Sequence, residues 1–128
     1  MAGTNRKKQV DLEETLPLKV KIASEVWTIE WHENNKLIDD DGTLLAGAAV
    51  FNNYTIRLER GQPTQGLLDT VRHEIAHAAH KVYGVKDRLT EEEFTERSTR
   101  AWTDIWIHNP KLVKWFSDAA KECRRGQP

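Results

Sequence analysis

Two histidines and a glutamate in one short stretch have the types and spacing of a metal site. The segment TVRHEIAHAA, residues 70–79, contains His73, Glu74 and His77 in the order His-Glu-x-x-His. On a helix, residues four apart share one face with Cβ atoms about 5–6 Å apart, so both imidazoles can converge on one ion. Zinc accepts such ligands and lowers the pKa of a bound water toward about 7, and Glu74 is placed to take that water's proton. The spacing therefore predicts zinc bound by His73 and His77, with Glu74 as general base.

The neighbours of the motif argue against accidental histidines on a solvated helix. Ile75 and three alanines lie between and after the histidines, and all four are uncharged side chains that pack readily. No proline or glycine interrupts residues 67–83. A histidine pair on a fully solvated face would not need such neighbours, so the metal-site interpretation is favoured over purely structural histidines.

Two imidazoles do not complete a zinc site, and a third protein ligand has to be sought. A metzincin would carry a histidine six residues after His77, but Tyr83 occupies that position and His80 replaces the preceding glycine. An acidic cluster instead opens the next predicted helix, which is expected to lie across the first. The cluster consists of Glu91, Glu92, Glu93 and Glu96.

A helical wheel does not choose among these carboxylates. Glu92 and Glu96 lie close together at one edge of the predicted inner face, and Glu91 lies nearer its middle, in the first turn. Glu93 has capping-box spacing to Thr90 and is better used there. The alternative is that all four form a solvated acidic helix start, which the helix dipole stabilises.

Further polar side chains are candidates for supporting roles. His80 falls on the face of the two histidines, where it would donate a hydrogen bond, stabilise a transition state or silence the site as a fourth ligand; a half-exposed histidine is the plain alternative. Tyr83 and Tyr54 are candidates for stabilising an oxyanion. Asp69 and Asp104 are candidates for orienting a ligand histidine, although both types are more often surface acids.

The elements that must position these side chains begin with strands. Residues 20–32 alternate between polar and apolar positions, as in a half-buried strand. Two short apolar runs at 48–51 and 54–58 flank Asn52-Asn53, which is typical of a tight hairpin.

Helices follow in the second half of the chain. Helical spacing extends over 64–83, ended by Gly84, and resumes at about 90–107 and 110–123, with Asn109 as the cap of the last helix. Strands followed by three helices indicate an α+β domain. The second helix is expected to turn inward Thr95, Ser98, Thr99, Trp102, Ile105 and Trp106. All five tryptophans fall at apolar spacing, which favours the core over a stacking platform for sugars or bases.

Composition bounds the possibilities. The chain has 128 residues, enough for one domain, and we expect an arm over 1–17, a single domain over 18–123 and a tail over 124–128. Nineteen basic residues against twenty acidic give a net charge of −1, which disfavours nucleic acid or an anionic membrane as partner. No apolar run approaches the roughly 20 residues of a membrane span, and the start of the chain lacks the apolar core of a secretion signal. The single cysteine, Cys123, fits a reducing, cytoplasmic compartment.

The motifs together resemble those of a minimal gluzincin, similar to the ImmA/IrrE-like metallopeptidases and to small metallopeptidase-like proteins of phages and prophages. The resemblance covers about residues 20–117 and rests on VWTIEW, YTIRLE, LLDTVRHEIAHAA, FTERSTRAW and HNPKLVKWF. It implies a zincin-like fold in which a small, mostly antiparallel sheet packs on the active-site helix, with two further helices. It also implies Glu96, followed by an arginine, as third ligand, with Glu92 as the alternative. The strand at 54–58 would be the sheet edge beside the cleft, able to hold an extended peptide.

The resulting hypothesis is a zinc-dependent metallopeptidase that hydrolyses peptide bonds in a peptide or protein partner, in the cytoplasm of a bacterial host if the chain comes from a phage. Its first rival is a catalytically silent, zinc-stabilised binding or regulatory module of phage or prophage type. A second rival is an α+β interaction domain without metal. The substrate, its cleavage preference and the oligomeric state are left open.

Overall fold

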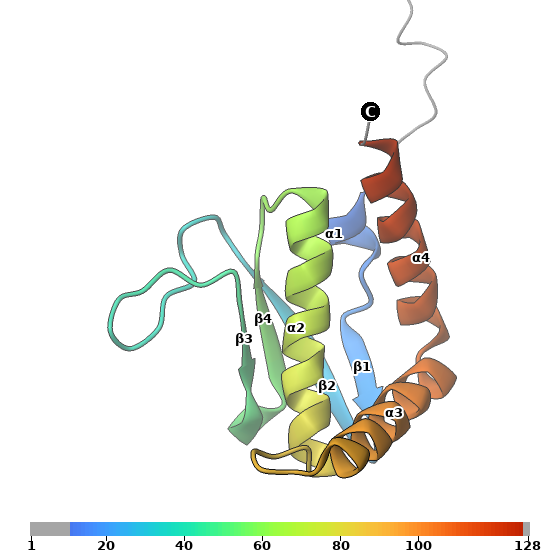
Figure 1. Cartoon of the computed structure of the whole chain (residues 1–128). Helices are drawn as coiled ribbons and strands as arrows, with labels where there is room; N and C mark the ends of the chain where they lie inside the picture. The colour runs from blue at the N-terminus through green and yellow to red at the C-terminus, as the bar shows by residue number, and fades with distance from the viewer. Residues whose placement is uncertain (1–10, 127–128) are drawn as a thin grey trace, which may run out of the picture.

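The protein folds into a small mixed sheet with helices on one of its faces (Figure 1). A computed structural model describes residues 11–126. The strands are β1 (Lys19–Ile22), β2 (Glu25–His32), β3 (Gly47–Val50) and β4 (Thr55–Glu59). The helices are α1 (Leu12–Thr15), α2 (Thr64–Tyr83), α3 (Glu91–His108) and α4 (Pro110–Arg125), and a 3-10 turn, η2 (Phe51–Asn53), joins β3 to β4. The predicted α+β class is confirmed, and within residues 11–126 no helix is long and apolar enough to cross a membrane.

The strands lie in the order β1-β2-β4-β3. β1 and β3 pair antiparallel with β2 and β4, whereas β2 and β4 pair parallel, which makes the sheet mixed. The sequence predicts one strand over 20–32, but Ala23, with a φ of 55°, turns the chain and divides the segment into β1 and β2. The expectation that 54–58 forms the sheet edge is wrong, because β4 is inserted between β2 and β3 and leaves β3 at the edge.

The core lies between α2 and one face of the sheet. Trp27 and Ile29 of β2 are buried on that face, whereas the alternate residues Val26, Thr28 and Glu30 are exposed. This is the alternation that the sequence predicts for a half-buried strand. The side chains that α2 buries are Leu67, Val71, Glu74, Ile75, Ala78 and Ala79. Only one of these side chains is ionisable, and it belongs to the predicted metal motif.

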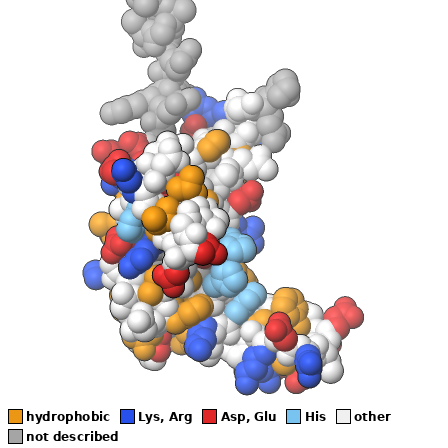
Figure 2. All heavy atoms as spheres, turned by 90° about the vertical axis from the view of Figure 1, so that its left-hand side faces the viewer, with side chains coloured by type: hydrophobic (Ala, Val, Ile, Leu, Met, Phe, Trp, Pro, Cys, Tyr) orange, Lys and Arg blue, Asp and Glu red, His pale blue; other side chains and the backbone are white. Residues whose placement is uncertain are grey.

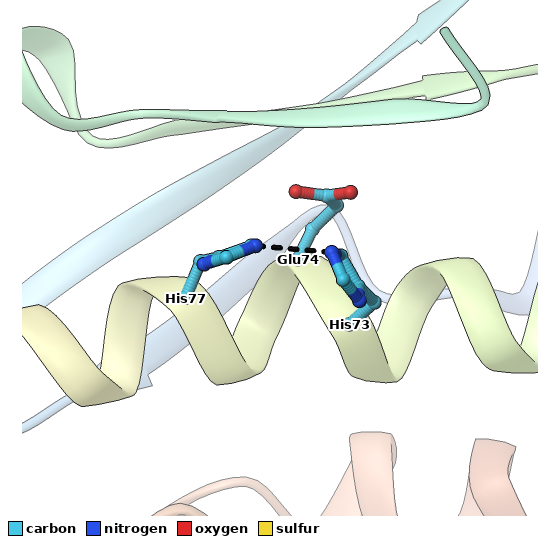
Figure 3. Close-up of side chains that lie close together, drawn as sticks. All are labelled: His73, Glu74 and His77. Atoms are coloured by element: carbon cyan, nitrogen blue, oxygen red, sulfur yellow. Dashed lines mark hydrogen bonds between the residues drawn. The ribbon is translucent and has the colours of Figure 1, made fainter. Parts of the chain in front are cut away.

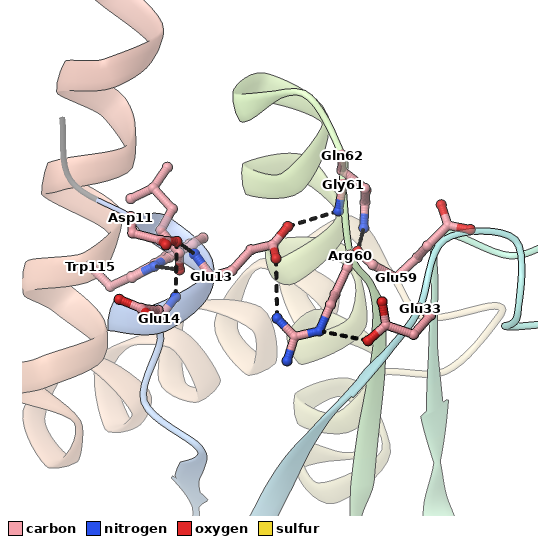
Figure 4. A network of polar contacts seen from close by, with 10 residues as sticks. Asp11, Glu13, Glu14, Glu33, Glu59, Arg60, Gly61, Gln62 and Trp115 are labelled. Atoms are coloured by element: carbon pink, nitrogen blue, oxygen red, sulfur yellow. Dashed lines mark hydrogen bonds and ion pairs between the residues drawn. The ribbon is translucent and has the colours of Figure 1, made fainter.

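The N-terminal segment is partly built into the fold. Residues 1–10 of the expected arm lie outside the described part of the chain, but residues 11–17 contribute α1 and bury Leu12 and Leu16. The indole Nε1 of Trp115 donates a hydrogen bond to the Leu12 carbonyl at 2.9 Å, and Glu13 accepts from Arg60 and from the Gly61 N–H (Figure 4). These contacts attach α1 to α4 and to the turn before α2, so the arm does not include residues 11–17.

The second helix begins as predicted but turns a different face inward. Thr90 and Glu93 form the expected capping box of α3. The residues it buries are Ala101 and Ile105, while Ser98 and Trp102 are half-buried. The outward residues include Thr95, Thr99 and Trp106, all expected inside. The inner face is thus rotated from the predicted one and is centred on Ala101 and Ile105.

Candidate metal centre

α2 brings the two histidines of the motif together at the surface. The Nε2 atoms of His73 and His77 are 3.0 Å apart and share a hydrogen bond, and the ring centroids are 4.6 Å apart (Figure 3). Both side chains are exposed, and histidines gather along one edge of the space-filling view in Figure 2. One uninterrupted helical turn positions the pair, so its geometry depends on the local backbone rather than on a loop.

The spacing of the two nitrogens fits a shared metal ion. Zn–N bonds of about 2.0–2.1 Å in a tetrahedral site place two ligand nitrogens about 3.3 Å apart. The observed 3.0 Å therefore needs a change of only a few tenths of an ångström. The ligand atoms of His73, Glu74 and His77 all lie within 4.8 Å of one another. Neutral imidazoles and a carboxylate form a donor set that zinc accepts.

Glu74 lies at the inner border of the site. It is 7% exposed, and its side chain packs beside the first residue of the edge strand β3. Burial raises the pKa of the Glu74 carboxyl, while the nearby His73 and His77 oppose that shift. In Figure 3 its carboxylate points away from the two imidazoles, toward the strands. A buried carboxylate with a raised pKa is suited to accept a proton near neutral pH.

The edge strand reaches Glu74 because residue 47 is a glycine. A Cβ atom at Gly47 would lie 2.7 Å from Cγ2 of Thr70 and 2.9 Å from Cγ of Glu74. Thr70 cannot easily yield, since its hydroxyl is hydrogen-bonded to Gln62 and to the Gly66 carbonyl. Sequence reasoning missed Gly47, because no local pattern marks a glycine needed for contact with a distant helix.

Replacing Gly47 by alanine is expected to displace Glu74 or β3 and to destabilise the fold by about 1–3 kcal/mol through overpacking. Any reaction that needs the Glu74 carboxylate should fall by about 100-fold, since a shift of 1 Å can cost that much. Metal affinity should stay unchanged, because the atoms nearest to a Cβ at residue 47 belong to Thr70, Glu74 and Arg57 and not to either imidazole. Gly66→Ala is the matched control: its Cβ would meet only Pro63, at 3.8 Å. Urea denaturation and a metal titration of both variants test this, and equal behaviour of the two alanine variants would contradict it.

A hollow of about 320 Å³ opens beside the motif. It is lined by Ala46, Gly47, Asp69, Thr70, His73 and Glu74. Asp69 lies one helical turn before His73 and lines the same hollow, so its carboxylate stays a candidate for orienting that imidazole. Asp104 is not available for this role, because its Oδ2 accepts the Ala23 N–H at 3.0 Å, at the turn between β1 and β2.

The predicted third ligand is not brought to the pair. Among residues 11–126, the group around the histidines contains no side chain of α3. Glu96 is 61% exposed and its Oε1 accepts a hydrogen bond from Arg100 at 3.0 Å, and Glu92 is exposed as well. Both lie opposite the observed inner face around Ala101. Within residues 11–126 neither carboxylate joins the histidine pair, because α3 turns both outward, and a third ligand from α3 stays a prediction.

His80 is adjacent to the pair without joining it. Its ring lies against the Phe94 ring of α3, with centroids 6.2 Å apart, and it is outside the three-residue group. Burial lowers the pKa of His80, and the neighbouring His77 adds to this shift. This position does not favour a fourth ligand that closes the site.

The two tyrosines lie elsewhere. Burial raises the pKa of Tyr83 to about 12, and a hydrogen bond to Asp104 adds to the shift. Tyr83 therefore faces the α3 carboxylate rather than the histidines. Tyr54 ends η2 with a φ of 52°, and its ring packs edge-on against Trp27, with centroids 5.6 Å apart. The contacts that the structure gives for these tyrosines are thus with Asp104 and Trp27 and not with the histidine pair.

The chain was also compared with known proteins. No protein-family model matches it, and neither a curated protein nor a solved structure matches it. The functional argument therefore depends on the geometry of His73, Glu74 and His77.

Proposed function

We propose that this protein is a zinc-dependent hydrolase of peptide bonds, with a metallopeptidase-like, zincin-like arrangement of helix and edge strand. His73 and His77 bind the metal, and Glu74 is the general base. The observation that carries the proposal is the pair of imidazole nitrogens 3.0 Å apart on one helical turn, with a buried carboxylate between them in sequence. The protein supplies two imidazole ligands to the metal. Asp69, which lines the adjoining hollow, is the candidate that orients the His73 ring.

Each side chain has a defined task in this proposal. Zinc at the histidines would lower the pKa of a water toward about 7 and polarise a carbonyl. Glu74 accepts the proton of the attacking water on a carboxylate oxygen and donates it to the leaving amine. Burial of Glu74 supports this exchange, because it raises the pKa of the carboxyl toward the working pH. Gly47 holds the edge strand close enough to fix the carboxylate.

The edge strand offers a place for the substrate backbone. Among residues 11–126, β3 pairs only with β4, so its other edge faces no strand of the described sheet. A Gly47 Cβ would collide with Glu74, which shows how closely β3 lies to the motif. An extended peptide that adds to this edge would bring a peptide bond beside the histidines. The binding edge is therefore β3, in place of the 54–58 strand that the sequence suggests.

A zinc titration of wild type beside two single variants tests the proposal. Loss of a residue that only orients a ligand costs about 10–100-fold in metal affinity, so His77→Ala should cost at least about 100-fold. Glu96→Ala is the matched control and should change affinity by less than about twofold, because this exposed side chain is ion-paired with Arg100 and lies outside the histidine group. Wild type should cleave an unstructured peptide library in a zinc-dependent manner, as followed by mass spectrometry. A weaker zinc site in Glu96→Ala would show that α3 supplies a ligand after all.

A silent zinc module remains the second candidate, supported by one observation. The Glu74 carboxylate lies within the same 4.8 Å group as the imidazole nitrogens, so it is close enough to act as a ligand instead of a base. A zinc ion bound by all three side chains would stabilise the fold but would leave no carboxylate free to act as general base. The glutamine variant of Glu74 separates the two candidates.

A further inference from the structure

A second hollow, of about 660 Å³, lies between α2 and α3, and none of its lining residues belongs to the His73–Glu74–His77 group. Its walls are formed chiefly by Trp102, Trp106 and Ile107, with Arg72 and Ser98 as polar members. Its volume falls within the roughly 300–1,000 Å³ of pockets that bind small molecules. Four of its lining residues, Ser98, Thr99, Trp102 and Trp106, are side chains that the sequence predicts on the inner face of α3.

The aromatic wall is rigid and exposed. Trp106 stacks on Phe116 with centroids 5.3 Å apart and planes 23° apart, and it meets Trp102 edge-on at 5.8 Å. Despite these contacts, Trp106 is 44% exposed and the adjoining Ile107 is 67% exposed. An indole held by its neighbours offers a ready-made surface for a planar apolar ligand, with little loss of side-chain entropy on binding.

The polar groups of the hollow lack partners. The Arg72 guanidinium lies over the Trp102 ring, 5.6 Å from its centroid, and forms no ion pair with any residue in 11–126. No acidic side chain lines the hollow. The Ser98 hydroxyl is buried without a hydrogen-bond partner among the described residues. A fixed positive charge and an unsatisfied hydroxyl beside indole rings favour a ligand that brings an anionic acceptor.

We propose that this hollow binds a small planar aromatic carboxylate. The ring of the ligand packs on Trp106 and Ile107, and its carboxylate accepts hydrogen bonds from the Arg72 guanidinium. An amine of the same shape would meet the charge of Arg72 and is disfavoured. The hollow shares no side chain with the metal centre, so this proposal does not depend on the proposed hydrolase function.

Calorimetric titration of the full chain with indole-3-acetate and indole-3-acetamide tests the proposal, because these probes share ring and size and differ in charge. The acetate should bind at least about tenfold more tightly than the acetamide. Arg72→Gln should abolish this difference, whereas Arg100→Gln, at an exposed arginine of α3 outside the hollow, should keep it. Trp106→Leu should weaken both probes.

The variants are checked for folding by their melting temperatures, and the titrations are repeated on His77→Ala to exclude binding of the carboxylate to metal. Retention of the difference in that variant supports the proposal. The proposal is overturned by equal affinity of the two probes, by no binding at millimolar concentration, or by an Arg72→Gln variant that still prefers the acetate. A wild type that binds the acetate but no zinc would refute only the hydrolase.

Discussion

Replacing Glu74 by glutamine is expected to leave zinc binding unchanged and to lower peptide hydrolysis by about 10²–10⁴-fold. Glutamine has nearly the same shape, so it keeps the packing against Gly47 and Thr70. It cannot accept a proton from water, and a general base contributes a factor of this size. Zinc affinity by chelator competition and initial rates on a cleavable peptide are the two measurements.

The same variant also reports on stability. Burial raises the pKa of Glu74 in the folded state, so its ionised form is less favourable there than in the unfolded chain. The stability linked to this group is present at low pH and is lost as the pH rises through the raised pKa. Near pH 7 the neutral Glu74→Gln variant should therefore melt no lower than wild type.

The outcome for zinc decides between the two candidate functions. Loss of zinc from Glu74→Gln, together with a lower melting temperature, would make Glu74 a ligand and the protein a zinc-stabilised module. Glu92→Gln, at an exposed position of α3, is the control that carries the same chemical change away from the motif. It should match wild type in zinc affinity, hydrolysis and melting.

The metal motif could be predicted from the sequence because it is local. His73, Glu74 and His77 lie within five residues of one helix, and helical geometry alone places the imidazoles side by side. The helix that carries the motif is also predictable from local signals, namely its apolar stripe and the glycine that ends it. Its apolar stripe is continuous, and Gly84 ends it with a φ of 70° and an N–H bonded to the His80 carbonyl. The observed bounds, Thr64–Tyr83, agree with the prediction.

The positions of the α3 carboxylates could not be predicted, because they depend on how α2 and α3 pack together. A wheel centred on the tryptophans and threonines of α3 turns Glu92 and Glu96 toward α2. The structure instead buries Ala101 and Ile105 and leaves Thr95 and Thr99 exposed. Which face of a helix packs inward depends on the surface of its partner as well as on its own side chains. The sequence of α3 alone therefore does not determine its inner face.

The order of the strands likewise depends on contacts between segments that are distant in the sequence. The hairpin of β3 and β4 is recognisable from two apolar runs and Asn52-Asn53. Its placement against β2 is not, since either strand of a hairpin can pair with the preceding sheet. β4 pairs with β2 in parallel, and the completely buried Ile56 and Leu58 lie on this interior strand. That choice makes β3 the edge strand beside Glu74 of the histidine motif.

Asn109 is a single side chain whose role could not be predicted from its neighbours in the sequence. Its position before Pro110 predicts a helix cap, and α4 does begin at Pro110, but the Asn109 side chain caps no backbone N–H. It is 8% exposed and bridges to β1: Oδ1 accepts the Lys21 N–H at 2.7 Å, and Nδ2 donates to the Lys21 carbonyl at 2.8 Å. Nδ2 also donates to the Ile105 carbonyl at 2.9 Å. The amide thus connects the α3–α4 corner to the outer strand of the sheet.

Replacing Asn109 by alanine should lower the free energy of unfolding by about 2–4 kcal/mol, because three hydrogen bonds are lost and buried backbone groups of Lys21 and Ile105 stay unpaired. For a domain of this size the melting temperature should fall by roughly 10 °C. Urea denaturation gives the first quantity and calorimetry the second. Asn52→Ala, at an exposed turn position, is the control and should change stability by less than about 0.5 kcal/mol.

Asn109→Asp separates the bridge from a cap. Aspartate caps helices as well as asparagine does, so a capping role predicts that this variant is as stable as wild type. The bridge predicts the opposite, because a carboxylate keeps the acceptor for the Lys21 N–H but loses both donors and turns negative charge toward two carbonyl oxygens. Asn109→Asp should therefore be destabilised at least as much as Asn109→Ala at pH 7. Wild-type stability in the aspartate variant would assign Asn109 to the start of α4 and would remove its bridge from the account of the fold.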